Sequence, residues 1–70
     1  MCARVFARIV ETATAYASGE ISAGELYRRA LGGDGAAEMV LRASEGIDPE
    51  ARDCLAALMT ARQGARGARA

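Results

Sequence analysis

Apolar residues recur at three- and four-residue steps through the first eighteen positions of the chain. They are Val5, Phe6, Ile9, Val10, Ala13, Tyr16 and Ala17. On a helical wheel, Arg4, Arg8 and Glu11 fall mainly on the opposite side. This period is that of an amphipathic α-helix. We therefore predict a first helix over residues 3–18, which ends before a glycine.

A second helix is predicted over residues 23–31 by the residues at its two ends. Ser22 and Glu25 have the spacing of a capping box, in which each side chain bonds the backbone amide of the other. Gly32 and Gly33 follow the helix, and either can adopt the left-handed conformation that closes a helix. This capping box is the sharpest local signal in the sequence, and its role is structural.

Two more helices are predicted from residues that favour helix starts. Asp34 is placed to cap a third helix over 35–45. Asp48 followed by Pro49 marks the start of a fourth helix over 49–63, because proline at the first helical position costs no hydrogen bond.

The last residues, 64–70, contain two glycines and no large apolar side chain, so we expect a flexible tail. No segment has the alternating pattern of a strand. The predicted fold class is therefore all-α, a compact bundle of four short helices in a single domain over 1–63. Two alternatives stay open: the third and fourth helices merge, or the first helix packs only on a partner.

The size of the chain limits the core that these helices can form. The protein has 70 residues, of which 51% are hydrophobic and only 4% are aromatic. For so short a chain, the burial of apolar surface barely exceeds the entropy lost on folding. We expect marginal stability for the isolated chain, and association with a second copy or another protein as its natural remedy.

The residue types that are missing argue against an enzyme. The chain has no His, Lys, Asn or Trp, which removes the commonest general base, the Schiff-base nucleophile and the commonest metal ligand. Cys2 and Cys54 lie far apart and lack metal-site spacing, so we expect two free thiols, with a disulfide between them as the alternative. We predict no catalytic residue, no cofactor and no metal.

The leading hypothesis is a small helical regulator that binds a protein partner or a second copy of itself. Its best contact residues are apolar or aromatic side chains that the helices are not expected to bury in the core, with two arginines as a charged rim. They are Phe6, Tyr16, Tyr27, Leu41, Arg28 and Arg29. Leu41 is included because it follows Met39 and Val40, and one helix face cannot bury three consecutive residues.

An alternative hypothesis is a regulator that binds nucleic acid through its ends. The net charge is zero, but residues 11–53 hold all nine acidic residues and four of the nine arginines. The remaining arginines lie near the two ends of the chain, where they could contact phosphates. They are Arg4, Arg8, Arg62, Arg66 and Arg69. A helix-turn-helix reading of the second and third helices fits poorly, because the recognition helix would carry two acids beside its one arginine.

The compartment is indicated only by general features. No window approaches the roughly 18 apolar residues that span a bilayer, and no signal peptide is evident. We expect a cytoplasmic protein without a membrane partner. The use of arginine as the sole cation, with seventeen alanines, favours a GC-rich bacterial or phage source.

Overall fold

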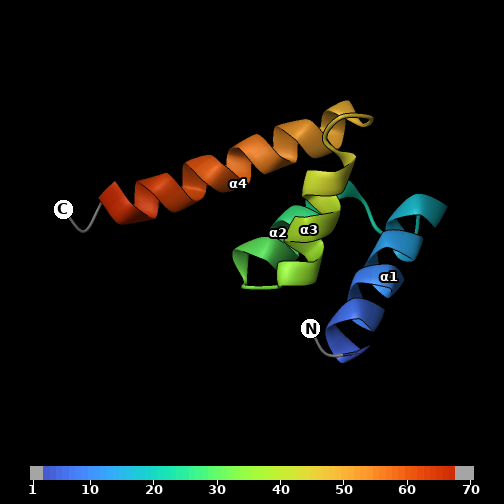
Figure 1. The fold of residues 1–70 in the computed structure, drawn as a ribbon. Coiled ribbons are helices and arrows are strands. Elements are labelled where there is room, and N and C mark those ends of the chain that lie inside the picture. Colours follow the sequence, from blue (N-terminus) through green and yellow to red (C-terminus); the bar gives the residue numbers. More distant parts are fainter. Residues whose placement is uncertain (1–2, 68–70) are drawn as a thin grey trace.

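The computed structural model describes residues 3–67, with side chains through Gly64. The chain forms four helices in this range, shown in Figure 1. They are α1 (Ala3–Ser18), α2 (Ala23–Leu31), α3 (Gly35–Ser44) and α4 (Pro49–Gly67). No strand is present among residues 3–67, and the predicted all-α fold is confirmed.

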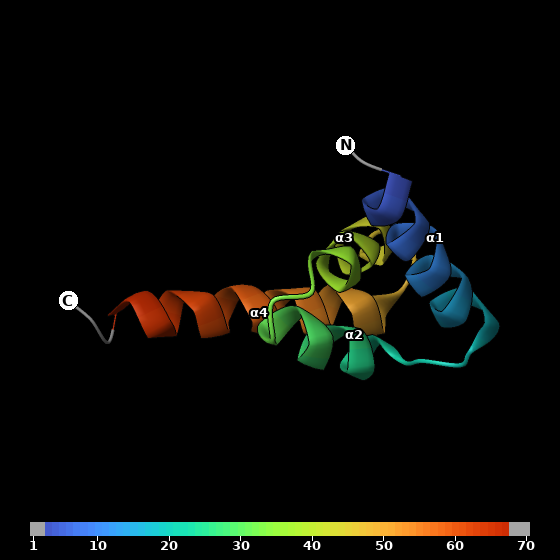
Figure 2. The ribbon, with the colours of Figure 1, turned by 90° about the horizontal axis from the view of Figure 1, so that it is seen from below.

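Helix α4 is longer than the sequence pattern indicated. Residues 64–67, expected as the start of a flexible tail, continue the helix, while 68–70 lie outside the described residues. Alanine is the strongest helix former, and Ala61 and Ala65 flank Gly64, whose cost in a helix is only about 1 kcal/mol. As a result, α4 extends past the other three helices (Figure 2).

The caps of α2 and α3 form largely as predicted. The Ser22 hydroxyl accepts a hydrogen bond from the Glu25 amide at 3.2 Å. The return half of the capping box is not made, because the Glu25 carboxylate instead pairs with the two arginines one turn later. Asp34 accepts from the amides of Ala36 and Ala37 at the start of α3. Gly33 takes a positive φ of 103° and so supplies the left-handed turn that reverses the chain between α2 and α3.

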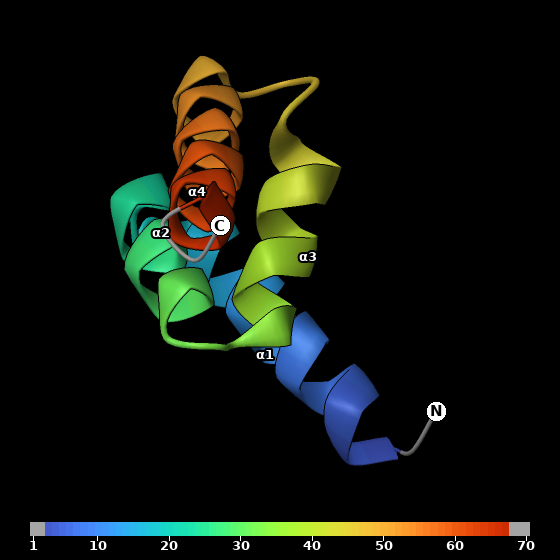
Figure 3. The ribbon, with the colours of Figure 1, turned by 90° about the vertical axis from the view of Figure 1, so that its left-hand side faces the viewer.

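The hydrophobic core lies between α2, α3 and α4. Its nine buried apolar side chains are Ala23, Leu26, Ala30, Ala37, Val40, Leu41, Ala51, Leu55 and Leu58. Four of the nine are alanines, which let the helices approach closely around the three fully buried leucines. Figure 3, which looks along α4, shows α2 and α3 beside it.

Helix α1 stands outside this core. It supplies none of the nine buried apolar side chains, and its one buried residue is Thr12. Its packing is mainly against α3, which it crosses obliquely (Figure 3). The amphipathic pattern of α1 is therefore only partly used inside the chain. Among residues 3–67, no helix combines the length and apolar character needed to cross a membrane.

Candidate protein-binding face on α1 and α3

Large apolar side chains are exposed mainly on α1, on α3 and in the turn after α3. Val5, Phe6 and Val10 lie on α1, Met39 lies on α3, and Ile47 lies in the turn, while Leu31 is exposed at the end of α2. Phe6 is 62% exposed and Ile47 is 86% exposed, values typical of polar surface residues. Exposed large apolar side chains that gather on neighbouring elements mark surfaces that bind other molecules.

Two parallel rows of side chains run along α1. The inner row consists of Ile9, Thr12 and Tyr16 and is partly or fully buried. The outer row consists of Phe6, Val10, Ala13 and Ala17, all exposed, and we call it the outer strip. Its steps of four, three and four residues are those of a coiled-coil seam, the spacing with which one helix contacts another.

An apolar groove of about 590 Å³ lies beside the outer strip, between α1 and α3. Its lining comprises Ile9, Ala13, Tyr16, Ala17, Met39, Val40, Ala43, Ser44, Ile47 and Asp48. Ala13 and Ala17 belong both to the groove and to the outer strip, so the two features are continuous. We call the outer strip, the groove and the exposed Met39 and Ile47 together the α1–α3 face.

The polar groups at one end of the groove bind each other. The Tyr16 hydroxyl donates a hydrogen bond to the Asp48 carboxylate, which also accepts from the Glu50 amide as the cap of α4. Burial and this bond raise the pKa of Tyr16 to about 12, while the same bond lowers the pKa of Asp48. Since no described side chain leaves a buried polar atom without a partner, the groove offers apolar contact rather than a reactive group.

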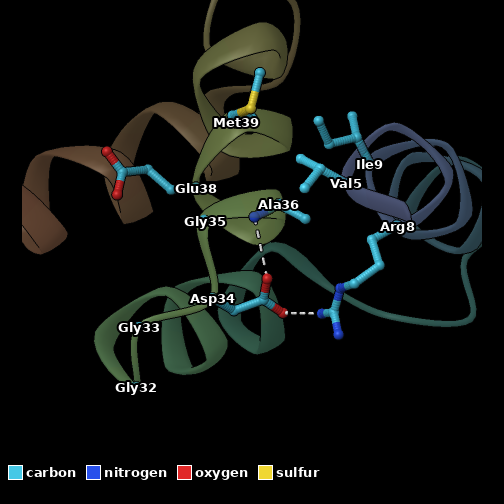
Figure 4. A pocket seen from close by; sticks show the side chains of 10 residues that line it. All are labelled: Val5, Arg8, Ile9, Gly32, Gly33, Asp34, Gly35, Ala36, Glu38 and Met39. Atoms are coloured by element: carbon cyan, nitrogen blue, oxygen red, sulfur yellow. Dashed lines mark hydrogen bonds and ion pairs between the residues drawn. The ribbon is translucent and has the colours of Figure 1, made fainter. Parts of the chain in front are cut away.

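A second cavity, of about 870 Å³, lies at the other end of α1 and is more polar (Figure 4). Val5 and Ile9 face it from α1, and Ala36 and Met39 face it from α3. Arg8 spans its edge and pairs with Asp34 at 2.8 Å. The charged groups that line it are already paired: Asp34 with Arg8 and the cap of α3, and Glu38 with Arg42 and Arg62.

The predicted contact residues of the first and third helices have different outcomes. Phe6 is exposed at the start of the outer strip, and Tyr16 is half-buried in the groove. The expectation that Leu41 is exposed is wrong, because Leu41 is fully buried in the same core as Leu26 and Leu58. Since α3 packs on α1 as well as on α2 and α4, it buries two neighbouring residues, and Met39 is the exposed member of the three.

The predicted contact residues of α2 lie away from the α1–α3 face. Tyr27 is half-buried and packs against the core. Arg28 and Arg29 are exposed and pair with Glu25 at 2.6 and 3.0 Å, an arrangement that lowers the pKa of Glu25. These three residues therefore do not join Phe6 and Tyr16 in one site.

The arginines proposed to contact nucleic acid are partly engaged within the chain. Arg8 pairs with Asp34, and Arg62 pairs with Glu38 at 2.5 Å, which lowers the pKa of that carboxyl. Arg4 is exposed near the start of α1. The Arg66 side chain and all of Arg69 lie outside the described part of the chain.

Sequence reasoning missed part of the α1–α3 face. Val10 and Ala13 were assigned to one apolar stripe of the first helix, and the regular step from Phe6 to Ala17 was the signal that they form a separate row. Met39 and Ile47 were not singled out. The signal for Ile47 was its position in a short turn between Gly46 and Asp48, where an apolar residue has no helix face to join.

Reactive chemistry finds little support among the described side chains. They include no group of three Cys, Asp or Glu that could hold a metal ion. Cys54 is a free thiol, and its partial burial, with help from nearby carboxylates, raises its pKa and makes it a poor nucleophile. Cys2 lies outside the described residues.

No protein family, curated protein or solved structure matches the chain in sequence or fold.

Proposed function

We propose that this protein is a small, non-enzymatic interaction protein that acts by binding a protein through its α1–α3 face. The observation that carries the proposal is the outer strip of α1, which keeps the spacing of a helix-binding seam but is exposed, with none of the helices formed by residues 3–67 covering it. A helix that supplies none of the nine buried apolar side chains and still exposes Phe6 and Val10 is typical of a binding element.

The chemistry of the face suits an apolar helix or loop as its ligand. Its exposed members are aliphatic or aromatic, and the polar groups of the groove satisfy one another. Contacts of this kind gain free energy from the removal of apolar surface from water, with no need for a charged ligand. Tyr16, with its raised pKa, stays neutral near pH 7 and serves as part of the groove wall.

Binding of nucleic acid through the ends of the chain has weaker support. Two of its five arginines, Arg8 and Arg62, already pair with acidic residues of the same chain. Phosphate contacts by these two would first have to break the ion pairs, and the same carboxylates would repel the phosphates. We therefore favour a protein as the ligand.

Affinity capture from the native cells with three forms of the full-length protein tests this function. The forms are the wild type, Val10→Arg, which places a charge in the outer strip, and Thr60→Arg, which makes the same change at an exposed position of α4. We expect a protein that survives nuclease treatment to be retained by the wild type and Thr60→Arg and lost with Val10→Arg. Equal capture by all three forms, or loss of everything with nuclease, would overturn the proposal.

A further inference from the structure

We propose that the outer strip of α1 binds the outer strip of a second copy of the chain, with the two helices antiparallel about a twofold axis. This inference rests on the proposed function, since it names the partner of the same face. It follows from the order of side-chain sizes along α1, from the position of the groove and from the orientation of the helix dipoles.

The outer strip is large at one end and small at the other. Phe6 and Val10 occupy its N-terminal half, and Ala13 and Ala17 occupy its C-terminal half. In an antiparallel pair centred between residues 11 and 12, Phe6 faces Ala17 of the second copy and Val10 faces Ala13. One register therefore matches large with small at all four levels, as close packing requires. A parallel pair would set Phe6 against Phe6 and leave the alanines apart.

The groove lies where this arrangement needs room. The ring of Phe6 is 62% exposed and projects from the N-terminal half of α1. Ala13 and Ala17 form part of the wall of the 590 Å³ groove. They are the residues that Val10 and Phe6 of the second copy would face. Phe6 of the second copy would thus enter the hollow beside Ala17, bounded on the far side by Ile47. By symmetry the same contact forms twice, as in other twofold interfaces.

The helix dipoles favour the same orientation. The outer strip itself contains no charged residue, so its pairing buries none. Arg4, Arg8 and Glu11 lie on the opposite side of α1 and do not enter the contact. The dipoles of the two helices are opposed in the antiparallel arrangement, which is the favourable one.

The available area predicts a weak dimer. Only two large and two small side chains of each copy pair, so the contact belongs with the weak interfaces that bury less than about 1,200 Å² in total. We expect a dissociation constant on the order of micromolar or weaker. The protein would then be monomeric when dilute and dimeric at higher local concentration.

Sedimentation equilibrium of the full-length chain, at about 1 to 300 μM, tests this pairing over the concentrations at which a weak dimer forms. The variants are Phe6→Ala, Ala17→Phe and the double variant that carries both changes. Ser18→Phe is the matched control, since it adds the same ring one position further along, outside the outer strip. Circular dichroism confirms that each variant keeps its helix content.

We expect the wild type to dimerise, each single variant to dimerise at least tenfold more weakly, and the double variant to recover, because its large and small residues have exchanged places. Ser18→Phe should associate like the wild type. A wild type that is monomeric throughout, a double variant that does not recover, or equal weakening by Ser18→Phe would overturn the self-pairing. The proposed function is tested by a different experiment, the affinity capture with Val10→Arg. A failure of the self-pairing therefore leaves the result of that capture unchanged.

Discussion

Replacement of Leu41 by alanine removes a side chain from the centre of the core and should cost about half of the protein's stability. Leu41 is fully buried on α3, the helix that packs against all three others. A buried Leu→Ala change costs about 2 to 5 kcal/mol, from lost apolar contact and the cavity left behind. A chain of this length has a total free energy of unfolding of only about 3.5 to 10 kcal/mol. We therefore expect Leu41→Ala to lose roughly half of that stability.

Urea unfolding followed by circular dichroism at low protein concentration measures this loss. With a dependence of about 1 kcal/mol per molar urea, the midpoint should fall by about 3 M. Met39→Ala, two residues earlier on the same helix, is the control, since Met39 is 47% exposed. It should cost less than about 1.5 kcal/mol, because only part of its apolar surface is buried. Equal effects of the two variants, or a stable Leu41→Ala with weakened association, would refute the burial of Leu41.

Three further predictions concern the contacts that hold the helices in place. Wild-type stability should fall between pH 10 and 12, because the neutral Tyr16 phenol, with its pKa near 12, is favoured in the folded chain; Tyr16→Phe should flatten that fall in pH-dependent melts. Gly33→Ala should destabilise by about 1 kcal/mol, since its φ is positive, whereas Gly35→Ala, in open space at the start of α3, should be neutral or stabilising in the same melts; the reverse order would contradict the turn. Asp34→Ala should lose about 1 kcal/mol of cap energy in urea unfolding, and Asp34→Asn, which can still cap, should recover most of it; no recovery would assign the effect to the ion pair with Arg8.

The elements of this fold were readable from the sequence because each has a local cause. The side chains of Ser22, Asp34 and Asp48 accept hydrogen bonds from backbone amides two or three residues later. The starts of α2, α3 and α4 can therefore be predicted from residues that are close in the sequence. The end of α4 was misplaced because its last turns are decided by the helix propensity of alanine, which a count of large apolar residues ignores.

The distribution of residues between core and surface was harder to predict. Leu41 and Met39 are both apolar and two positions apart, and only the directions from which α2 and α4 approach decide which of them is buried. The same holds for α1, whose apolar stripe is wide enough for a core helix. That α1 lies outside the core, with Phe6 and Val10 exposed, depends on long-range packing that no local pattern encodes.

Site-specific photo-crosslinking in the native cells tests most directly whether the α1–α3 face binds protein. A photo-activated side chain placed at Ile47, the most exposed large apolar position, is compared with one at Thr60 on α4. We predict a discrete protein adduct at Ile47, either the size of two copies or larger, and none at Thr60. No adduct at Ile47, or the same adducts at both positions, would contradict the assignment of this face.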